Sequence, residues 1–208
     1  LYDEKGQAFL RGREYEVLDD RVFQAVSDTR TPQGVLCVME QFRYSLEDLM
    51  ARENPHLLIL ENLQDPGNLG TILRTAEGAG ADGIILSRTS VDLYNPKTIR
   101  PTMGSIYRMP FLYVDRIEDI LPELKARGIR TYAAHLRGEH CYDEEDYRGG
   151  TAFFIGNEGN GLSEELSGRA DTLIRIPMEG KLESLNAAVA ASILMYEVSR
   201  QRRILRKR

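Results

Sequence analysis

Three short polar clusters hold the side chains of this sequence that could take part in chemistry. Each follows an apolar run and combines glycine with amide, carboxylate, hydroxyl or guanidinium groups. In chain order, the clusters supply Asn68, Arg74, Asn157, Glu158, Ser184 and Asn186. None of them contains histidine or cysteine, and no metal-ligand spacing occurs along the chain, so we expect no metal. In open α/β sheets, ligands bind at the carboxyl ends of the strands. Polar clusters that follow buried strands therefore predict a ligand-binding site at that edge of the sheet.

The first cluster, residues 61–74, combines a strand exit, a Pro-Gly turn and a helix start. Asn68 is a favourable N-cap, and apolar residues recur at helical spacing over residues 68–81. Arg74 lies opposite that apolar stripe, so the core does not need it. Two interpretations stay open for Arg74: a solvated helix arginine, or a ligand-binding group near a strand end.

The second cluster, residues 153–163, is an apolar strand that runs into a loop rich in glycine. Glycine permits positive φ and close backbone approach, so such a loop can wrap a small ligand with its amides. It is neither a Walker loop nor a G-x-G-x-x-G turn, which disfavours a phosphate cradle and a nicotinamide-dependent dehydrogenase. Alternatively, the loop is a plain turn closed by Ser163 as a helix N-cap, and the two interpretations are compatible.

The third cluster, residues 176–191, passes from a strand end through a loop into an alanine-rich helix. That helix is apolar nearly all round, so we expect it to be buried on several sides. Ser184 and Asn186 stand at its start, where they could cap the helix or face a ligand.

The elements that must position these clusters follow from the hydrophobic pattern. From Leu57 onward, β-rich runs alternate with helical or loop stretches, which predicts an α/β fold with a parallel sheet and crossover helices. The expected strands are residues 57–61, 83–87, 111–114, 131–135, 152–156 and 172–177. Most are apolar throughout, so both faces of the sheet should be covered.

The N-terminal part has a different pattern. Residues 19–27 predict a short helix and residues 35–40 a strand, as at the end of a separate small domain. The more polar residues that follow would serve as a linker. We therefore expect a small domain at residues 1–42, a linker at 43–56 and the main domain at 57–208.

Composition limits the classes of protein. The net charge of −5 disfavours a protein that coats nucleic acid through bulk charge. The tail is nevertheless basic, and it is either a solvated helix end or a phosphate contact; it holds Arg200, Arg202, Arg203, Arg206, Lys207 and Arg208. No apolar run reaches the ~20 residues of a membrane span. Two isolated cysteines, Cys37 and Cys141, indicate a reducing compartment, so we expect a cytoplasmic protein.

Taken together, the three clusters resemble motifs one, two and three of the SpoU/TrmH family of RNA 2′-O-ribose methyltransferases, in the SPOUT superfamily. The resemblance covers about residues 57–203. Motif one matches residues 68–74, motif two 157–163 and motif three 184–187. Residues 97–110 are also similar to the family's stretch between the second and third strands. Pro101 and Thr102 replace the small residue and serine expected there, so we assign them no role.

The resemblance implies a SPOUT-type sheet with a trefoil knot, in which motifs two and three form the knot and hold S-adenosylmethionine. It also implies a homodimer with the methyl donor near the interface, and the apolar helix at residues 187–198 suits such an interface. Donor contacts would come mainly from the backbone at Leu136, Gly156, Asn157, Ile176, Met178, Leu185 and Ala187.

The implied reaction moves a methyl group from a sulfonium to a ribose 2′-hydroxyl, which must lose its proton as it attacks. The implied catalytic residues are Arg74, Asn68, Glu158, Ser184 and Asn186. The family's proposal makes Arg74 activate the hydroxyl, but a group with a pKa above ~12 is a poor base. We favour an Arg74 that grips the neighbouring phosphate, with the proton lost to that phosphate or to water. Asn68 would fix the ribose or Arg74, and Glu158 would orient Arg74 or the same arginine of the second copy. Ser184 and Asn186 would complete the RNA-facing pocket.

Residues 17–39 are similar to the end of the small ribosomal-protein-like domain that captures RNA in many family members, and Leu1 suggests a missing upstream piece. Such a domain favours ribosomal RNA over transfer RNA as the substrate. Three alternatives stay open: a tRNA 2′-O-methyltransferase, a SPOUT enzyme that methylates a base, and a non-catalytic RNA-binding relative. The last would lose motif residues, whereas Arg74, Glu158 and Asn186 are all present.

Overall fold

The structure, a computed structural model, describes residues 4–27 and 30–205 and divides into two compact units, Leu1–Phe42 and Arg43–Arg208. The first unit contains the helices α1 (Glu4–Leu10) and α2 (Asp20–Val26). The Asp19 side chain caps α2, which confirms the helix expected there. Residues 35–40 form no strand, and Val38 is 95% exposed, so that prediction is wrong. A β-rich run needs a neighbouring strand, and the described part of this unit supplies none.

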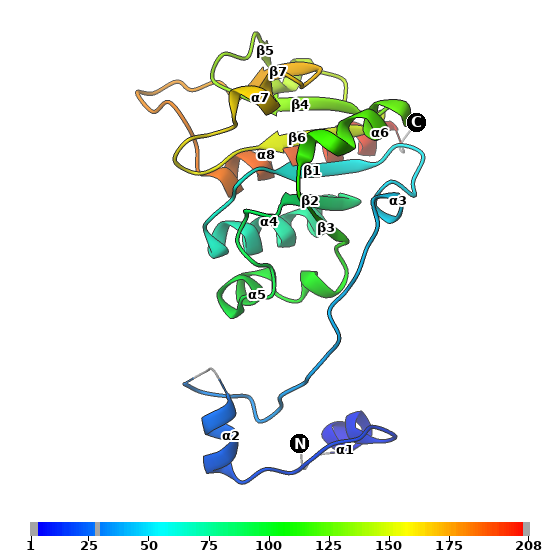
Figure 1. Cartoon of the computed structure of the whole chain (residues 1–208), viewed down its shortest axis with the longest axis vertical. Helices are drawn as coiled ribbons and strands as arrows, with labels where there is room; N and C mark the ends of the chain where they lie inside the picture. The colour runs from blue at the N-terminus through cyan, green and yellow to red at the C-terminus, as the bar shows by residue number, and fades with distance from the viewer. Residues whose placement is uncertain (1–3, 28–29, 206–208) are drawn as a thin grey trace. The chain divides into compact units, whose positions relative to one another are not determined.

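The second unit is built on a sheet of seven parallel strands in the order β3-β2-β1-β6-β4-β7-β5 (Figure 1). The strands are β1 (His56–Leu60), β2 (Gly83–Ser87), β3 (Phe111–Val114), β4 (Arg130–Ala134), β5 (His140–Cys141), β6 (Thr151–Ile155) and β7 (Thr172–Arg175). All six expected strands are present, and β1, β2 and β6 are buried along their whole length. The extra strand, β5, is too short to leave a periodic signal.

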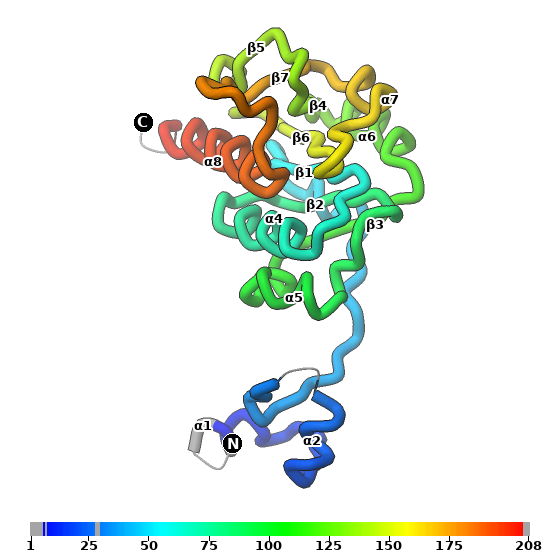
Figure 2. The backbone as a smooth tube through the Cα atoms, turned by 90° about the vertical axis from the view of Figure 1, so that its left-hand side faces the viewer, coloured from blue at the N-terminus to red at the C-terminus, as the bar shows by residue number. Residues whose placement is uncertain are grey.

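Helices cover both faces of the sheet, as the apolar strands predict. Their bounds are α3 (Leu46–Leu49), α4 (Pro66–Ala79), α5 (Pro96–Thr102), α6 (Leu121–Ala126), α7 (Glu164–Ser167) and α8 (Ala187–Leu205), with 3-10 turns η1 (Ser105–Tyr107), η2 (Ile117–Ile120) and η3 (Tyr142–Glu144). On one face α4 and α8 pack side by side, and α5 packs on α4 (Figure 2). On the other face, α3, α6 and α7 share a core with alternate residues of β1, such as Leu57 and Ile59.

Residues 43–56 do not act as a linker, because they belong to the sheet unit. Ser45 and Asp48 form a capping box at the start of α3. Leu49 and Met50 are buried in the core, and Leu49 packs flush against β2. A Cβ on Gly83 of that strand would lie 2.3 Å from Leu49 Cγ. The boundary between the two units therefore falls between residues 42 and 43.

The C-terminal helix differs from its expected burial. Val189 is 47% exposed and Tyr196 50% exposed, so α8 is covered on one side only within this chain. The described arginines of the basic tail are engaged internally. Arg200 pairs with Glu197 at 2.7 Å, and Arg202 donates to the carbonyl oxygen of Gly149 at 2.7 Å. Arg203 donates to the carbonyl oxygen of Ser199, and Arg206, Lys207 and Arg208 lie outside the described residues.

All seven strands point the same way, so their carboxyl ends meet at one edge of the sheet. The loops that follow β1, β6 and β7 carry the three polar clusters to that edge. The parallel sheet with helices on both faces confirms the expected fold class. The trefoil knot stays a prediction.

His56, at the start of β1, makes stability depend on pH. It is 1% exposed, and its Nε2 has no hydrogen-bond partner among the described residues. Burial, helped by the charge of Arg202, lowers the pKa of His56 from 6.5 to about 3. The unfolded chain therefore binds the proton more tightly, so stability is fully present above pH 6.5 and is lost as the pH falls toward 3.

We expect the free energy of unfolding to fall by about 2 kcal/mol between pH 7 and pH 5 through this group. Urea titrations at several pH values measure it. A His56→Leu variant should show a flatter profile in that window, whatever its absolute stability. Equal slopes for the two proteins would contradict the assignment.

Candidate active site

A chain of hydrogen bonds joins the three polar clusters at the carboxyl edge of the sheet. Asn68, in the first turn of α4, donates through Nδ2 to Oε1 of Glu158 at 3.0 Å. Asn186, just before α8, donates through Nδ2 to Oδ1 of Asn68 at 2.9 Å. One residue from each cluster thus enters a single network, although the clusters lie far apart in the sequence.

Asn68 is not the N-cap of α4, contrary to expectation. Asp65 occupies that position, and its Oδ1 accepts a hydrogen bond from the backbone N–H of Asn68 at 2.6 Å. Pro66 follows as the first helical residue, a position that suits proline because its missing N–H needs no partner. The side chain of Asn68 is therefore available to the network.

Glu158 is an anchoring carboxylate. Besides Asn68, it accepts hydrogen bonds from the backbone N–H groups of Gln64 at 3.2 Å and Asp65 at 3.0 Å. Partial burial raises the pKa of Glu158, but these hydrogen bonds together outweigh that effect and leave the pKa below its ordinary value. Glu158 is thus ionised at neutral pH and holds the entry of α4 in place.

Asn186 has two partners that fix its orientation. Its Oδ1 accepts hydrogen bonds from the backbone N–H groups of Ala188 at 2.9 Å and Val189 at 3.3 Å, so it caps α8. Its Nδ2 reaches Asn68. The capping and ligand-facing interpretations are therefore compatible at this residue. Ser184 is exposed and forms no hydrogen bond with any residue that the structure describes.

The loop of the second cluster is held by its own side chains and by Glu61. Asn157 donates to the carbonyl oxygen of Asn62 at 2.8 Å and accepts from the backbone N–H of Gly159 at 2.8 Å. Ser163 caps α7, as expected, and both its N–H and its hydroxyl donate to the Glu61 carboxylate at 2.7 Å. Sequence reasoning missed Glu61, although a carboxylate directly after a strand is a usable signal.

Two hydroxyls at the end of β2 support the first cluster, and sequence reasoning missed them. Ser87 accepts a hydrogen bond from the backbone N–H of Asn62 at 2.9 Å, and Ser90 accepts one from Leu63 at 3.1 Å. Asn62 has a positive φ of 53°, which few residues adopt without such support. The turn into α4 is therefore braced from β2 as well as from Glu158.

Arg74 stands apart from this network. Its side chain is exposed, and it forms no hydrogen bond or ion pair with any residue in the described part of the chain. The predicted position opposite the apolar stripe of α4 is confirmed, because Leu73 and Ala76 on that stripe are fully buried. The guanidinium is therefore available to a partner outside this chain.

The expected donor-binding residues fall in loops that leave three adjacent strands, β6, β4 and β7. Leu136 is 65% exposed after β4, and Gly156 begins the loop after β6. Residues 176–185, which contain Ile176, Met178 and Leu185, form no backbone hydrogen bond with the described residues, and Ala187 begins α8. The backbone N–H and C=O groups of this segment could therefore form hydrogen bonds with a ligand.

His135 and His140 make their contacts outside this network. His135 accepts a hydrogen bond from the backbone N–H of Arg137, and His140 lies 3.5 Å from Glu145.

Within residues 4–27 and 30–205, no group of three or more metal-ligating side chains is placed to hold an ion. None of the described helices is long and apolar enough to cross a membrane.

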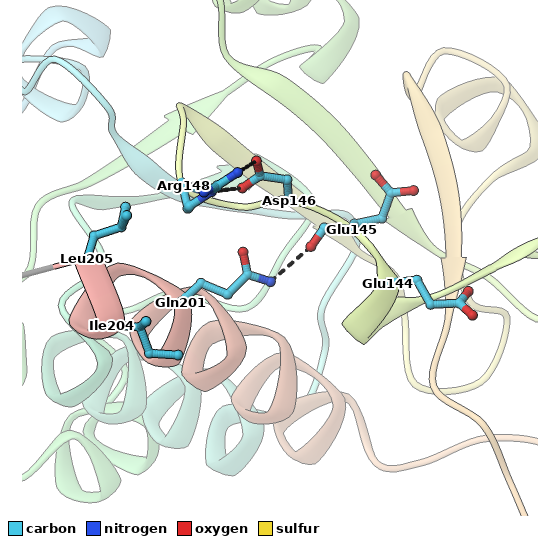
Figure 3. A pocket seen from close by; sticks show the side chains of 7 residues that line it. All are labelled: Glu144, Glu145, Asp146, Arg148, Gln201, Ile204 and Leu205. Atoms are coloured by element: carbon cyan, nitrogen blue, oxygen red, sulfur yellow. Dashed lines mark hydrogen bonds and ion pairs between the residues drawn. The ribbon is translucent and has the colours of Figure 1, made fainter. Parts of the chain in front are cut away.

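A hollow of about 320 Å³ lies at the far end of α8 from Asn186 (Figure 3). Its walls include Gln201, Glu145 and the ion pair between Arg148 and Asp146. None of the expected site residues lines it. Glu145 pairs with Arg130 and Asp146 with Arg148, while Glu144 accepts a hydrogen bond from the backbone N–H of Cys141. This hollow is therefore separate from the candidate site.

The fold and the position of the polar clusters are those of α/β enzymes, which typically bind their ligands at the carboxyl edge of a parallel sheet. The profile of the SpoU rRNA methylase family matches residues 55–196, so the chain belongs to that family.

Individual relatives agree with this assignment. The 23S rRNA (guanosine(2553)-2′-O)-methyltransferase RlmP of Bacillus subtilis is 37% identical over 88% of this chain and 71% of its own length. A crystal structure of an AdoMet-bound rRNA methyltransferase from Sinorhizobium meliloti is 36% identical, with a TM-score of 0.82, over 94% of this chain and 75% of that one. The SpoU methyltransferase AviRb of Streptomyces viridochromogenes, in complex with AdoMet, is 32% identical with a TM-score of 0.72, over 76% of this chain and 62% of that one.

Proposed function

We propose that the protein transfers the methyl group of S-adenosylmethionine to a ribose 2′-hydroxyl of ribosomal RNA. The observation that carries this proposal is the hydrogen-bond chain from Glu158 through Asn68 to Asn186, which joins the three polar clusters. Arg74 lies further along the same helix as Asn68 and is exposed. The RlmP relative, which is named for ribose methylation of 23S rRNA, supports the substrate. A 32% identical solved structure concerns 2-OH methylation of C/U34 on tRNA, and it keeps transfer RNA as the second candidate.

The methyl donor is proposed to bind across the loops after β4, β6 and β7. The backbone of Leu136 and Ile176 would hold the adenine and ribose, since no backbone hydrogen bond joins these two residues to others in the described part of the chain. Gly156 and Asn157 would shape one wall. Two AdoMet-bound relatives support this choice of donor. Bound there, the donor supplies an electrophilic methyl group on a sulfonium.

Arg74 is proposed to grip the phosphate beside the target ribose through two parallel hydrogen bonds, which orients the attacking hydroxyl. The attacking hydroxyl then gives its proton to that phosphate or to water. Asn68 and Asn186 each keep an amide N–H beyond the bonds described above, and these would contact the ribose. Glu158 is proposed as a positioning residue, because its oxygens already accept three N–H groups. Ser184 would complete the RNA-facing side.

A homodimer through α8 is part of the proposal. Val189, Ile193 and Tyr196 recur at helical spacing on α8, and the first and last of them are about half exposed. A second copy would cover this stripe. We expect light scattering to give a dimer at micromolar concentration and a Tyr196→Asp variant to dissociate. A monomeric wild-type protein would contradict the arrangement.

The first unit, residues 1–42, is proposed to assist RNA capture. A cytoplasmic location would suit a ribosomal RNA substrate.

The test of the proposed function uses purified ribosomal RNA and methyl-labelled S-adenosylmethionine. Ribose methylation blocks alkaline cleavage at the neighbouring phosphodiester, so labelled product should appear in an alkali-resistant dinucleotide. Label confined to transfer RNA would favour the second candidate, and label in a base would reject ribose transfer.

A further inference from the structure

A second surface borders Arg74 along α4. Residues 96–108, which we call the α5–η1 shoulder, pack against the same helix (Figure 1). Gly70 precedes Arg74 by four residues and Glu77 follows it by three, so the three positions share one side of α4. The shoulder is attached to α4 at both Gly70 and Glu77, and Arg74 lies between the two attachments.

Both attachments are tight. A Cβ on Gly70 would lie 2.5 Å from the carbonyl oxygen of Thr98 and 2.8 Å from Cβ of Pro101, so the two helices touch there through their backbones. Glu77 accepts a hydrogen bond from Arg108 Nη2 at 3.0 Å and another from the Ser105 hydroxyl. Pro101, which departs from the family pattern, thus has a packing role against Gly70. The shoulder is a rigid neighbour of Arg74.

The exposed side chains of the shoulder are basic, apolar and aromatic. Met103 is 69% exposed and Tyr107 is 53% exposed, and Lys97 and Arg100 are exposed as well. No acidic residue occurs between Asn95 and Val114, in a chain whose net charge is −5. Cations next to an exposed aromatic ring are the combination that binds unpaired nucleotides, through phosphate contacts and base stacking.

We propose that the α5–η1 shoulder binds single-stranded RNA beside the nucleotide that is methylated. Tyr107 stacks on a neighbouring base, and Lys97 and Arg100 contact the phosphates on either side. This inference rests on the proposed function, which places the target ribose at Arg74. The positive charge of the shoulder favours RNA over an apolar protein partner.

Fluorescence anisotropy with the full chain and a labelled, mixed-sequence single-stranded RNA of about 12 nucleotides tests the proposal. Tyr107→Ala should weaken binding about tenfold at every salt concentration, as the loss of one stacked base predicts. Tyr107→Phe should bind as the wild type does, because the ring is kept. The double variant Lys97→Ala/Arg100→Ala should lower the slope of log affinity against log salt by about 1.4, or about 0.7 for each lost phosphate contact.

The matched control is Lys125→Ala/Arg127→Ala, which removes two exposed cations at α6 on the other face of the sheet. Melting temperature and calorimetric donor affinity identify any variant that is misfolded, and Tyr107→Leu then replaces Tyr107→Ala. The proposal is overturned if the shoulder variants bind RNA like the wild type, or if the control pair changes the salt slope equally. Binding is measured without methyl transfer, so an inactive wild type would reject the proposed function while this assay still decides on the shoulder.

Discussion

Arg74→Ala is expected to slow methyl transfer by about 100- to 1000-fold, the loss typical for removal of one preorganised donor. The fold should survive, since Arg74 is exposed and bonds to no described residue, so truncation opens no cavity. What disappears is the charge-assisted grip on phosphate that orients the hydroxyl. Single-turnover transfer at saturating donor measures the rate, and calorimetry should give an unchanged donor affinity.

Arg74→Lys is the informative companion variant. Lysine keeps the charge but lacks the planar fork, so it cannot rebuild a two-point contact, and activity should fall almost as far as in Arg74→Ala. Near-full activity in Arg74→Lys would mean that charge alone is enough. Unfolding of Arg74→Ala would instead show that this arginine serves the fold.

Gly156→Ala is expected to have the largest effect on stability, with a loss of at least about 3 kcal/mol or a failure to fold. A Cβ at this position would lie 2.1 Å from the carbonyl carbon of Gly161 and 2.2 Å from the backbone nitrogen of Leu162. Both are backbone atoms of the loop that carries the second motif, so neither can rotate away. Chemical denaturation followed by circular dichroism measures the change.

Gly159→Ala, in the same loop, is the matched control. Its added Cβ would meet only the Asn157 side chain, at an ordinary contact distance of 3.4 Å. We expect this variant to stay within about 1 kcal/mol of the wild type. If the two variants were equally stable, the close backbone approach at Gly156 would not be a real constraint.

The sequence predicts the sheet well because strands buried on both faces leave apolar runs that are hard to mistake. It predicts the cap of α4 poorly, because both Asp65 and Asn68 are good N-cap residues. Pro66 decides between the two. Proline prefers the first helical position, which makes the residue before it, Asp65, the N-cap. Ser45 and Asp48 also indicate a helix start, because they have the spacing of a capping box. They lie inside the segment that was expected to be a linker.

The site itself is only partly visible in the sequence. Asn68, Glu158 and Asn186 stand out by type, but their contacts join residues about a hundred positions apart, which no periodicity can reveal. The backbone that is proposed to hold the donor has no side-chain signature at all. The hydroxyls of Ser87 and Ser90 accept hydrogen bonds from the turn before α4, which lies about 25 residues earlier in the sequence. Only the folded chain shows this contact.

The position of β1 in the sheet has a consequence for biosynthesis. Leu57 pairs with Gly83 on one side, soon after β1 is made, but with Ala152 on the other side. Until β6 leaves the ribosome, one edge of a strand that is apolar from Leu57 to Leu60 has no neighbour, and such edges template aggregation. Translation that stalls between these two strands would therefore release an aggregation-prone fragment, and chaperones would have to cover that edge during synthesis.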